Sequence, residues 1–199
     1  MTGSLSTKAI VEAQQNGHWN ILYQPMGFVI FLICAFAECN RTPFDLPECE
    51  TELIGGYHTE YSSMKLGFFL FAEYINMFIS GAVMATLYFG GYDYAGVDFV
   101  TAQLGATAAT LIGMGALIGK ALAFVFIFMW VRWTLPRFRY DQLMGLGWSG
   151  LIPIAMFNVV VTGLGVLLNQ QILIGFGGLV VFIAGIVVYD QLFVKKKIA

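Results

Sequence analysis

Five long apolar stretches, nearly free of charged residues, place the strongest limit on what this chain can fold into. They cover residues 21–37, 66–89, 107–133, 146–169 and 172–193. About 20 mainly apolar residues in a helix are enough to cross the ~30 Å hydrocarbon core of a bilayer. Strands are not expected, because the apolar residues do not alternate with polar ones and a segment in lipid must satisfy its own backbone hydrogen bonds. The sequence therefore predicts an all-α polytopic membrane helix bundle with about five transmembrane helices, in a single membrane domain over residues 1–199.

The composition agrees with a membrane protein. Hydrophobic residues make up 58% of the chain and charged residues 11%, with a mean hydropathy of +0.76, which leaves too few charges to cover a soluble globule. No basic arm favours nucleic acid as a partner. The three cysteines lack paired CxxC spacing, so we expect no disulfide framework and no zinc or iron–sulfur site, and hence no metal ligands.

The positive charges indicate how the chain is oriented. Residues 91–103, between the second and third stretches, contain no Lys or Arg, and only Lys8 precedes the first stretch. Lys and Arg are enriched on the cytoplasmic side of membrane proteins. Loops 38–65 and 134–145 and the C-terminus are therefore predicted to be cytoplasmic. The residues that fall on that side are Arg41, Lys65, Arg132, Arg137, Arg139, Lys195, Lys196 and Lys197.

An acidic segment, residues 37–61, follows the first apolar stretch and reads AECNRTPFDLPECETELIGGYHTEY. It holds six of the twelve acidic residues of the chain. Its two prolines cannot lie inside a regular helix, so the chain must leave the first span and turn. The Asp45–Glu48 spacing is typical of a helix cap and predicts a short helix over residues 46–54, ended by Gly55 and Gly56. The segment is either a solvated loop or part of a polar site.

Three charged residues lie in or at the end of apolar stretches. Glu38 and Glu73 are expected to be neutral or paired, because an ionised carboxylate is costly in lipid. Lys120 lies about halfway along the third stretch, too deep to reach the interface easily. This position favours a buried partner or a water-filled path, with a structural ion pair between helices as the alternative.

The connection VRWTLPRFRYDQLMGLGW is the second charged element. Its arginines either anchor the chain at the membrane interface, or they form a polar site or a docking surface for another subunit. The polar-site interpretation requires that this connection lie beside the acidic segment, which it does if the helices pack as neighbours. The charged residues of the connection are Arg132, Arg137, Arg139 and Asp141.

Two stretches, AECNRTPFDLPECETELIGGYHTEYSSMKLGFFLFAEYINM and WTLPRFRYDQLMGLGW, resemble the C-terminal part of the H-subunit family of bacterial NADH:quinone oxidoreductase, respiratory complex I. The resemblance runs from about Ser4 to Asn169. It implies a membrane subunit without a redox centre that helps form the quinone chamber and couples quinone reduction to proton translocation through a carboxylate-lined path. The residues it assigns to this role are Glu38, Arg41, Asp45, Glu48, Glu50, Glu52, Tyr57, Glu60, Tyr61, Glu73, Lys120 and Arg132. Arg137, Arg139 and Asp141 match the family's second loop.

The resemblance also implies the surroundings of the chain. Quinone is the expected substrate of the complex, and NADH, FMN and iron–sulfur clusters are expected in partner subunits of the membrane and peripheral arms. The expected location is an energy-transducing membrane, such as the bacterial inner membrane. The family's N-terminal half has no counterpart ahead of Met1, so the chain alone should not hold a complete quinone site. The alternatives are a membrane anchor of a related hydrogenase or ferredoxin-linked complex, and a stand-alone ion channel or transporter.

Overall fold

The structure, a computed structural model, describes residues 3–46, 52–94, 105–168, 177 and 180. Regular structure in these residues is helical throughout, and none of them lies in a strand. The prediction of an all-α fold is confirmed for this part of the chain. Three of the helices are long and apolar enough to cross a membrane.

The N-terminal third forms three helices, α1 (Thr7–Gln15), α2 (Asn20–Tyr23) and α3 (Pro25–Glu38). The expected first span over residues 21–37 is not one continuous helix. Gln24, with φ −135° and ψ 62°, separates α2 from α3, and Pro25 begins the new helix because it tolerates the first turn but not a helix interior. The 14 residues of α3 rise about 21 Å, which falls short of the hydrocarbon core.

Two long helices form the centre of the molecule, α5 (Met64–Tyr88) and α7 (Ala106–Thr134), and a 3₁₀ turn, η1 (Gly56–Thr59), precedes them. They lie within two residues of the apolar stretches 66–89 and 107–133 at each end. α5 ends in a turn in which the Gly91 amide donates to the Ala85 carbonyl, and Gly91 has a φ of +57°. A Cβ at Gly91 would lie 2.8 Å from the Val11 side chain, so both the backbone conformation and the space favour glycine there.

The last described helices follow one another without a break: α8 (Tyr140–Gly145), η2 (Leu146–Leu151) and α9 (Ile152–Leu167). η2 is a π-helix, whose wider turn accommodates an extra residue. The expected loop over residues 134–145 is therefore shorter, because helix resumes at Tyr140. The expected fifth span, 172–193, lies outside the described residues except for residues 177 and 180.

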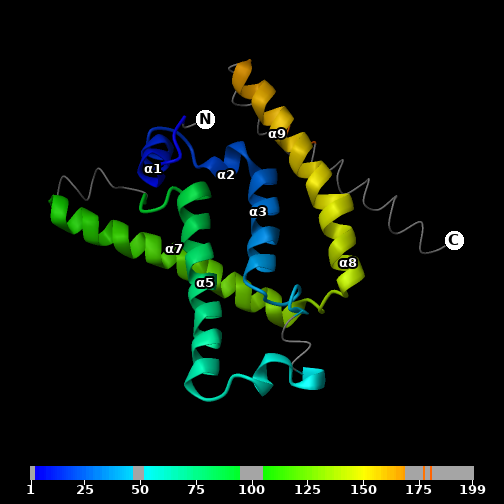
Figure 1. The fold of residues 1–199 in the computed structure, drawn as a ribbon. Helices are drawn as coiled ribbons and strands as arrows, with labels where there is room; N and C mark the ends of the chain where they lie inside the picture. Colours follow the sequence, from blue (N-terminus) through cyan, green and yellow to red (C-terminus); the bar gives the residue numbers. More distant parts are fainter. Residues whose placement is uncertain (1–2, 47–51, 95–104, 169–176, 178–179, 181–199) are drawn as a thin grey trace.

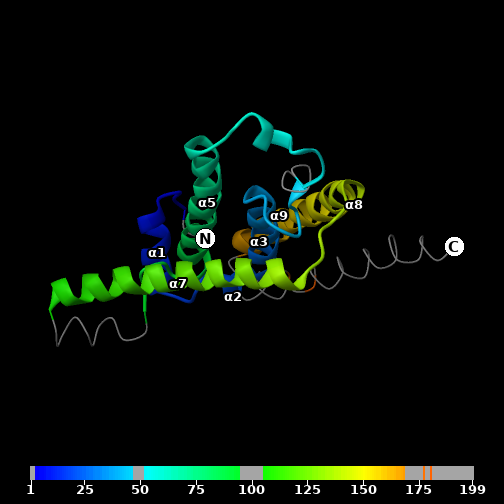
Figure 2. The same ribbon diagram turned by 90° about the horizontal axis from the view of Figure 1, so that it is seen from below.

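The helices cross at different tilts. In Figure 1, α3 and α5 run alongside each other while α7 crosses them obliquely, and Figure 2 shows α7 as a bar along one side of the molecule. At the crossing, a Cβ on Gly81 of α5 would lie 3.0 Å from the Ala121 carbonyl oxygen of α7, so the two backbones are in close contact. Met84, Phe124 and Phe128 fill the core around this crossing.

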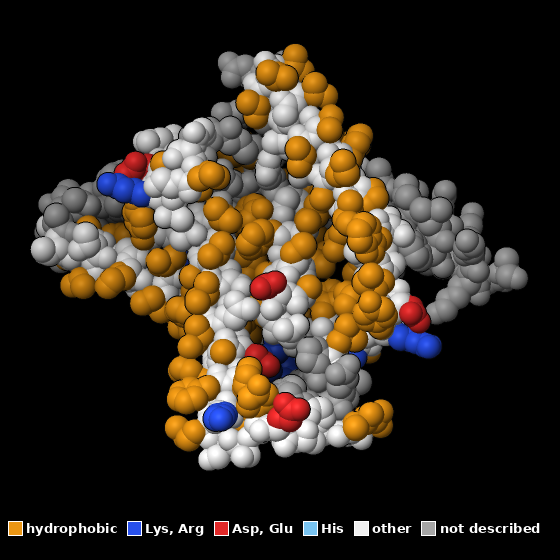
Figure 3. Space-filling view, viewed as in Figure 1, with side chains coloured by type: hydrophobic (Ala, Val, Ile, Leu, Met, Phe, Trp, Pro, Cys, Tyr) orange, Lys and Arg blue, Asp and Glu red, His pale blue; other side chains and the backbone are white. Residues whose placement is uncertain are grey.

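The acidic segment and the N-terminal helix lie at opposite ends of the bundle (Figure 1). In the space-filling view, hydrophobic side chains cover much of the visible surface along α5 and α9 (Figure 3). Several of the charged side chains seen in that view lie toward the end that carries the acidic segment. This separation of apolar sides from a charged end is typical of a bundle that spans lipid.

Candidate functional site

The acidic segment begins with a tight turn at the end of α3. Asn40 adopts a left-handed conformation, with φ +47°, which asparagine tolerates better than most residues. The Phe44 amide then donates to the Arg41 carbonyl at 2.9 Å and closes a second turn. The chain thereby folds back under α3, and Arg41 and Asp45 become buried, with only 5% and 3% of their surface exposed.

Arg41 is held between two residues of α5. Its guanidinium lies 3.7 Å from a Glu73 carboxylate oxygen and 4.5 Å from the centre of the Tyr74 ring. Its buried Nε has no hydrogen-bond partner among the described residues. Glu73 is thus paired, as expected for a carboxylate on an apolar helix, and the buried cation keeps one donor unused.

Arg137 joins two carboxylates of the acidic segment. Its two terminal nitrogens donate to the two oxygens of Glu52 at 2.8 and 2.9 Å, and one of them lies 3.7 Å from an Asp45 oxygen. The neighbouring Phe138 amide donates to the Pro43 carbonyl at 2.9 Å. The second connection therefore lies directly beside the acidic segment, which is the arrangement that the polar-site interpretation requires.

These contacts define the ionic cluster, which comprises Arg41, Asp45, Glu52, Glu73 and Arg137. The hydrogen bonds from Arg137, followed by its positive charge, lower the pKa of Glu52 below its ordinary value. A bidentate arginine–carboxylate pair fixes both partners geometrically as well as electrostatically. Arg41 thus faces Glu73 of α5, and Arg137 of the 135–139 connection faces Asp45 and Glu52 of the acidic segment.

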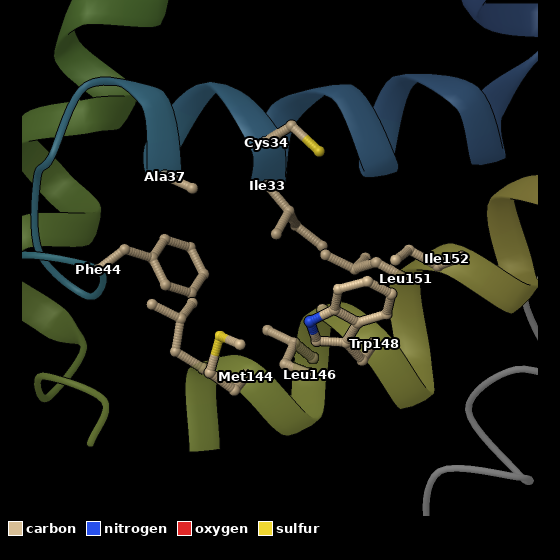
Figure 4. Close-up of a pocket in the computed structure, with 11 residues that line it drawn as sticks. Ile33, Cys34, Ala37, Phe44, Met144, Leu146, Trp148, Leu151 and Ile152 are labelled. Carbon is tan, nitrogen blue, oxygen red and sulfur yellow. The ribbon is translucent and has the colours of Figure 1, made fainter. Parts of the chain in front are cut away.

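An apolar cavity of about 240 Å³ is lined by residues of α3, α8, η2 and α9 and by Phe44, the residue before Asp45. Figure 4 shows Ile33 and Ala37 on α3 facing Leu146, Trp148 and other side chains of the opposite helix, with Phe44 closing one side. Phe44 also stacks on Phe138, with ring centres 5.7 Å apart. Phe44 precedes Asp45 and Phe138 follows Arg137. Their stacking therefore connects the wall of the cavity to the connection that carries Arg137. The cavity is lined by Ile33, Cys34, Ala37, Phe44, Leu143, Met144, Leu146, Gly147, Trp148, Leu151 and Ile152.

Lys120 is far from the ionic cluster, at the other end of α5. Its ammonium donates to the backbone carbonyls of Phe89 at 2.7 Å, Gly91 at 3.0 Å and Asp93 at 2.5 Å, and lies 5.3 Å from the Trp19 ring centre. Because α7 crosses α5 obliquely, the middle of α7 reaches the C-terminal end of α5. The buried partner expected from the sequence exists, but it is a set of carbonyls rather than a carboxylate.

The remaining candidate residues are more scattered. The Glu38 side chain is exposed and its carbonyl accepts a hydrogen bond from Asn76 at 3.4 Å, while Arg139 and Asp141 form an exposed pair at 3.5 Å. Tyr61 packs edge-on against Phe69 at 5.0 Å. Glu60 is exposed and Arg132 is half-buried. Glu48, Glu50 and the side chain of Tyr57 lie outside the described residues.

Two residues of the site were missed by the sequence reasoning. Tyr74, which covers Arg41, follows Glu73 directly and could have been suspected from that adjacency. Phe44 lies between Pro43 and Asp45, and no local pattern separates it from the chain's many other phenylalanines. Its importance arises from its place in the cavity wall and from its contact with Phe138, a residue 94 positions later in the sequence.

Known proteins share most of this sequence. A family model described as NADH dehydrogenase matches residues 1–163. The H subunit of NADH-quinone oxidoreductase from Flavobacterium psychrophilum is 62% identical over 168 residues, covering 84% of this chain and 49% of that protein. The H subunit numbered 1 from Cytophaga hutchinsonii is 62% identical over 167 residues, or 84% and 48% of the two chains. NADH-quinone oxidoreductase subunit 8 of Rhodothermus marinus is 49% identical over 174 residues, or 83% and 51%. The chain spans about half the length of the curated relatives it matches.

Proposed function

The chain belongs to the NADH dehydrogenase family, and on that premise we propose that it forms part of the membrane subunit that couples quinone reduction to proton translocation in an NADH:quinone oxidoreductase. The observation that carries the proposal is Arg137, which binds Glu52 and approaches Asp45, four residues after the buried Arg41 that pairs with Glu73. The proposed role is that of a subunit without a redox centre. NADH, FMN and iron–sulfur clusters would lie in partner subunits of the two arms.

Two carboxylates of the ionic cluster are coupled through one cation. Asp45 and Glu52 both face Arg137, so a change of charge on one alters the electrostatic energy of the other. A negative charge that appears about 4 Å away would shift such a group by about 4 kcal/mol at an effective dielectric of 20, equivalent to about three pKa units. A reduced, negatively charged quinone intermediate nearby would therefore redistribute protons within the cluster.

The cavity supports quinone as the substrate. A quinone combines a polar head with an apolar tail and requires an apolar space that borders polar groups. Phe44 lines the cavity, whose lining residues are uncharged, and the next residue of the chain is the buried Asp45. The complete quinone chamber would also require the part of the family that lies outside this chain.

The proposed setting is an energy-transducing membrane, with the bacterial inner membrane as the expected location. The acidic segment and the C-terminus would face the cytoplasm, because the arginines of the 135–139 connection gather at that end. Lipid, quinone and the other complex subunits are then the partners of the chain. Three helices of sufficient length and apolarity are consistent with this setting.

The experiment is to introduce Asp45→Asn and Glu73→Gln into the full-length subunit of the assembled complex. We expect a lower rate of quinone reduction or fewer protons moved per electron, with unchanged electron transfer from NADH to an artificial acceptor. Glu12→Gln, which changes an exposed side chain of α1, is the matched control. Wild-type quinone reduction together with wild-type proton translocation in both cluster variants would refute the proposal.

A further inference from the structure

Lys120 uses all of its hydrogen-bonding capacity on the turn that ends α5. An ammonium has three donors, and the structure gives it three carbonyl acceptors, on Phe89, Gly91 and Asp93. These carbonyls lie at or just beyond the C-terminal end of α5, where the helix dipole favours a cation. The Trp19 ring adds a cation–π contact at 5.3 Å.

We propose that Lys120 is a positioning residue that fixes α7 across the end of α5 and thereby holds Arg137 in the ionic cluster. The effect of Lys120 on activity rests on the proposed function, in which the ionic cluster couples quinone reduction to proton movement. It assigns Lys120 a place outside the path that protons take.

The partners of Lys120 cannot relay a proton. Backbone carbonyls accept hydrogen bonds but are not bases that take up the proton of an ammonium. Among the described residues, no carboxylate oxygen lies within 4 Å of this ammonium. Within this part of the chain, the contacts of Lys120 therefore fix the position of its side chain through carbonyls, and Asp93 acts on the ammonium only through its charge.

The turn that Lys120 binds is also held by residues of the N-terminal segment. Gln14 of α1, which is buried, accepts a hydrogen bond from the Gly90 amide at 3.0 Å and donates to the Thr86 carbonyl at 3.0 Å. Asn20 donates to the Leu87 carbonyl at 2.9 Å. The end of α5 is thus a fixed support, so a bond between this support and α7 fixes α7 as well.

The rest of α7 connects this support to the ionic cluster. Ala121, the residue after Lys120, packs against Gly81 of α5 with the backbones in close contact. From Lys120 to the end of α7 at Thr134 the helix extends about 21 Å. The chain then continues into Arg137 and into Phe138, whose amide is bound by Pro43. A helix held at its middle and by the residues just beyond its end keeps a fixed direction.

The test is amide hydrogen exchange of the assembled complex carrying Lys120→Met, which removes the charge at similar length. We expect at least about fivefold faster exchange at Gly91, near the lost contacts, and also at Phe138, at the far end of α7. Lys65→Met, an exposed lysine in the first turn of α5, is the matched control and should change neither. Faster exchange at Gly91 alone would overturn the proposal, because the contact would then be local.

Two further measurements distinguish a positioning residue from a proton carrier. Because displacing Arg137 should act as removing its charge does, Lys120→Met should lower quinone reduction or the number of protons per electron at least about threefold, as Arg137→Gln does, and the double variant should show no further loss. Independent, additive losses in the double variant would show that Lys120 acts separately from Arg137 and would overturn the proposal. Lys120→Arg keeps the cation and should recover part of the lost rate. If the complex with Lys120→Met does not assemble, amide exchange is measured in Lys120→Arg instead. Faster exchange at Gly91 with wild-type exchange at Phe138 in that variant would overturn the proposal.

The outcome is separable from that of the proposed function. If Arg137→Gln and Glu52→Gln leave quinone reduction and proton translocation unchanged, the ionic cluster has no coupling role and the proposed function fails. The exchange at Phe138 still reports whether Lys120 fixes α7. Faster exchange at both Gly91 and Phe138 with unchanged activity would show that Lys120 positions α7 but that this positioning does not affect quinone reduction or proton translocation.

Discussion

Neutralising Glu73 should destabilise the protein far more than neutralising Glu12, although both carboxylates lie 3.7 Å from their cations. The two pairs differ in burial. The Arg41 and Glu73 side chains are 6% and 34% exposed, and those of Lys8 and Glu12 are 78% and 52% exposed. Burial decides how much water screens a charge pair, so this chain contains its own matched comparison.

The expected magnitude follows from the distance. At 3.7 Å and an effective dielectric of 20, a charge pair interacts by about 4.5 kcal/mol. Because Glu73 is partly exposed, we expect about half of this, about 2 kcal/mol, to appear as coupling between Arg41 and Glu73. This corresponds to about a 30-fold change in the unfolding equilibrium. The Lys8–Glu12 pair should contribute about 0.3–0.5 kcal/mol, as is usual for exposed pairs one helical turn apart.

The assay is a double-mutant cycle in detergent, with Arg41→Met and Glu73→Gln in one cycle and Lys8→Met and Glu12→Gln in the other. The free energy of unfolding of the full-length protein is measured for each single and double variant. Equal coupling in the two cycles, or a larger coupling for Lys8–Glu12, would refute the argument from burial. In the assembled complex, Glu73→Gln should also slow quinone reduction, while Glu12→Gln should not.

Three other perturbations test separate parts of the structure. Gly81→Ala should cost about 1–3 kcal/mol of unfolding free energy, because the new methyl group meets the Ala121 carbonyl, whereas Gly67→Ala on the same helix meets nothing within 4 Å and should be neutral or slightly stabilising. Arg137→Gln should raise the pKa of Glu52 toward its ordinary value, measured by isotope-edited infrared titration. Because Arg137 lowers that pKa, the pair stabilises the protein fully above the ordinary pKa of Glu52, and this stabilisation is lost as the pH falls through the lowered pKa. An unchanged Glu52 titration would contradict the pairing. Gln14→Leu should cost about 1–3 kcal/mol and expose α1 to proteolysis, because it leaves the Gly90 amide without its acceptor, whereas Gln15→Leu changes an exposed side chain and should not.

The long helices were the most predictable part of the fold. The stretches 66–89 and 107–133 match α5 and α7 closely, because lipid-compatible helices require continuous apolar runs that are visible in the sequence. The break at Gln24 was less visible, since Pro25 can either begin a helix or follow one. The oblique course of α7 depends on Gly81 and on the partners of Lys120, and no local sequence period encodes either contact.

The site was predictable in its composition but not in its pairing. The acidic segment and the arginines of the 135–139 connection stood out by charge, and the structure brings Arg137 to Glu52 across 85 residues of sequence. The sequence could not assign Arg41 to Glu73 or leave Glu38 exposed, because both outcomes depend on which face of each helix turns inward. For Lys120 the sequence predicted a buried partner or a water-filled path, and the structure gives it part-buried carbonyl partners, which carry no charge and so cannot be recognised from a charge pattern.

The π-helix at residues 146–151 also determines how the last described helix is aligned with the first part of the chain. Gln24, at the break before α3, donates to the Thr162 hydroxyl of α9 at 3.2 Å. A π segment absorbs one extra residue in a wider turn, so the α-helix after it keeps the orientation that it would have without that residue. A deletion within the regular turns between this segment and Thr162 would instead rotate everything after it by about 100° and turn Thr162 away from Gln24. The π segment is therefore a place where this membrane helix can lose a residue without exchanging the lipid-facing and protein-facing positions of α9.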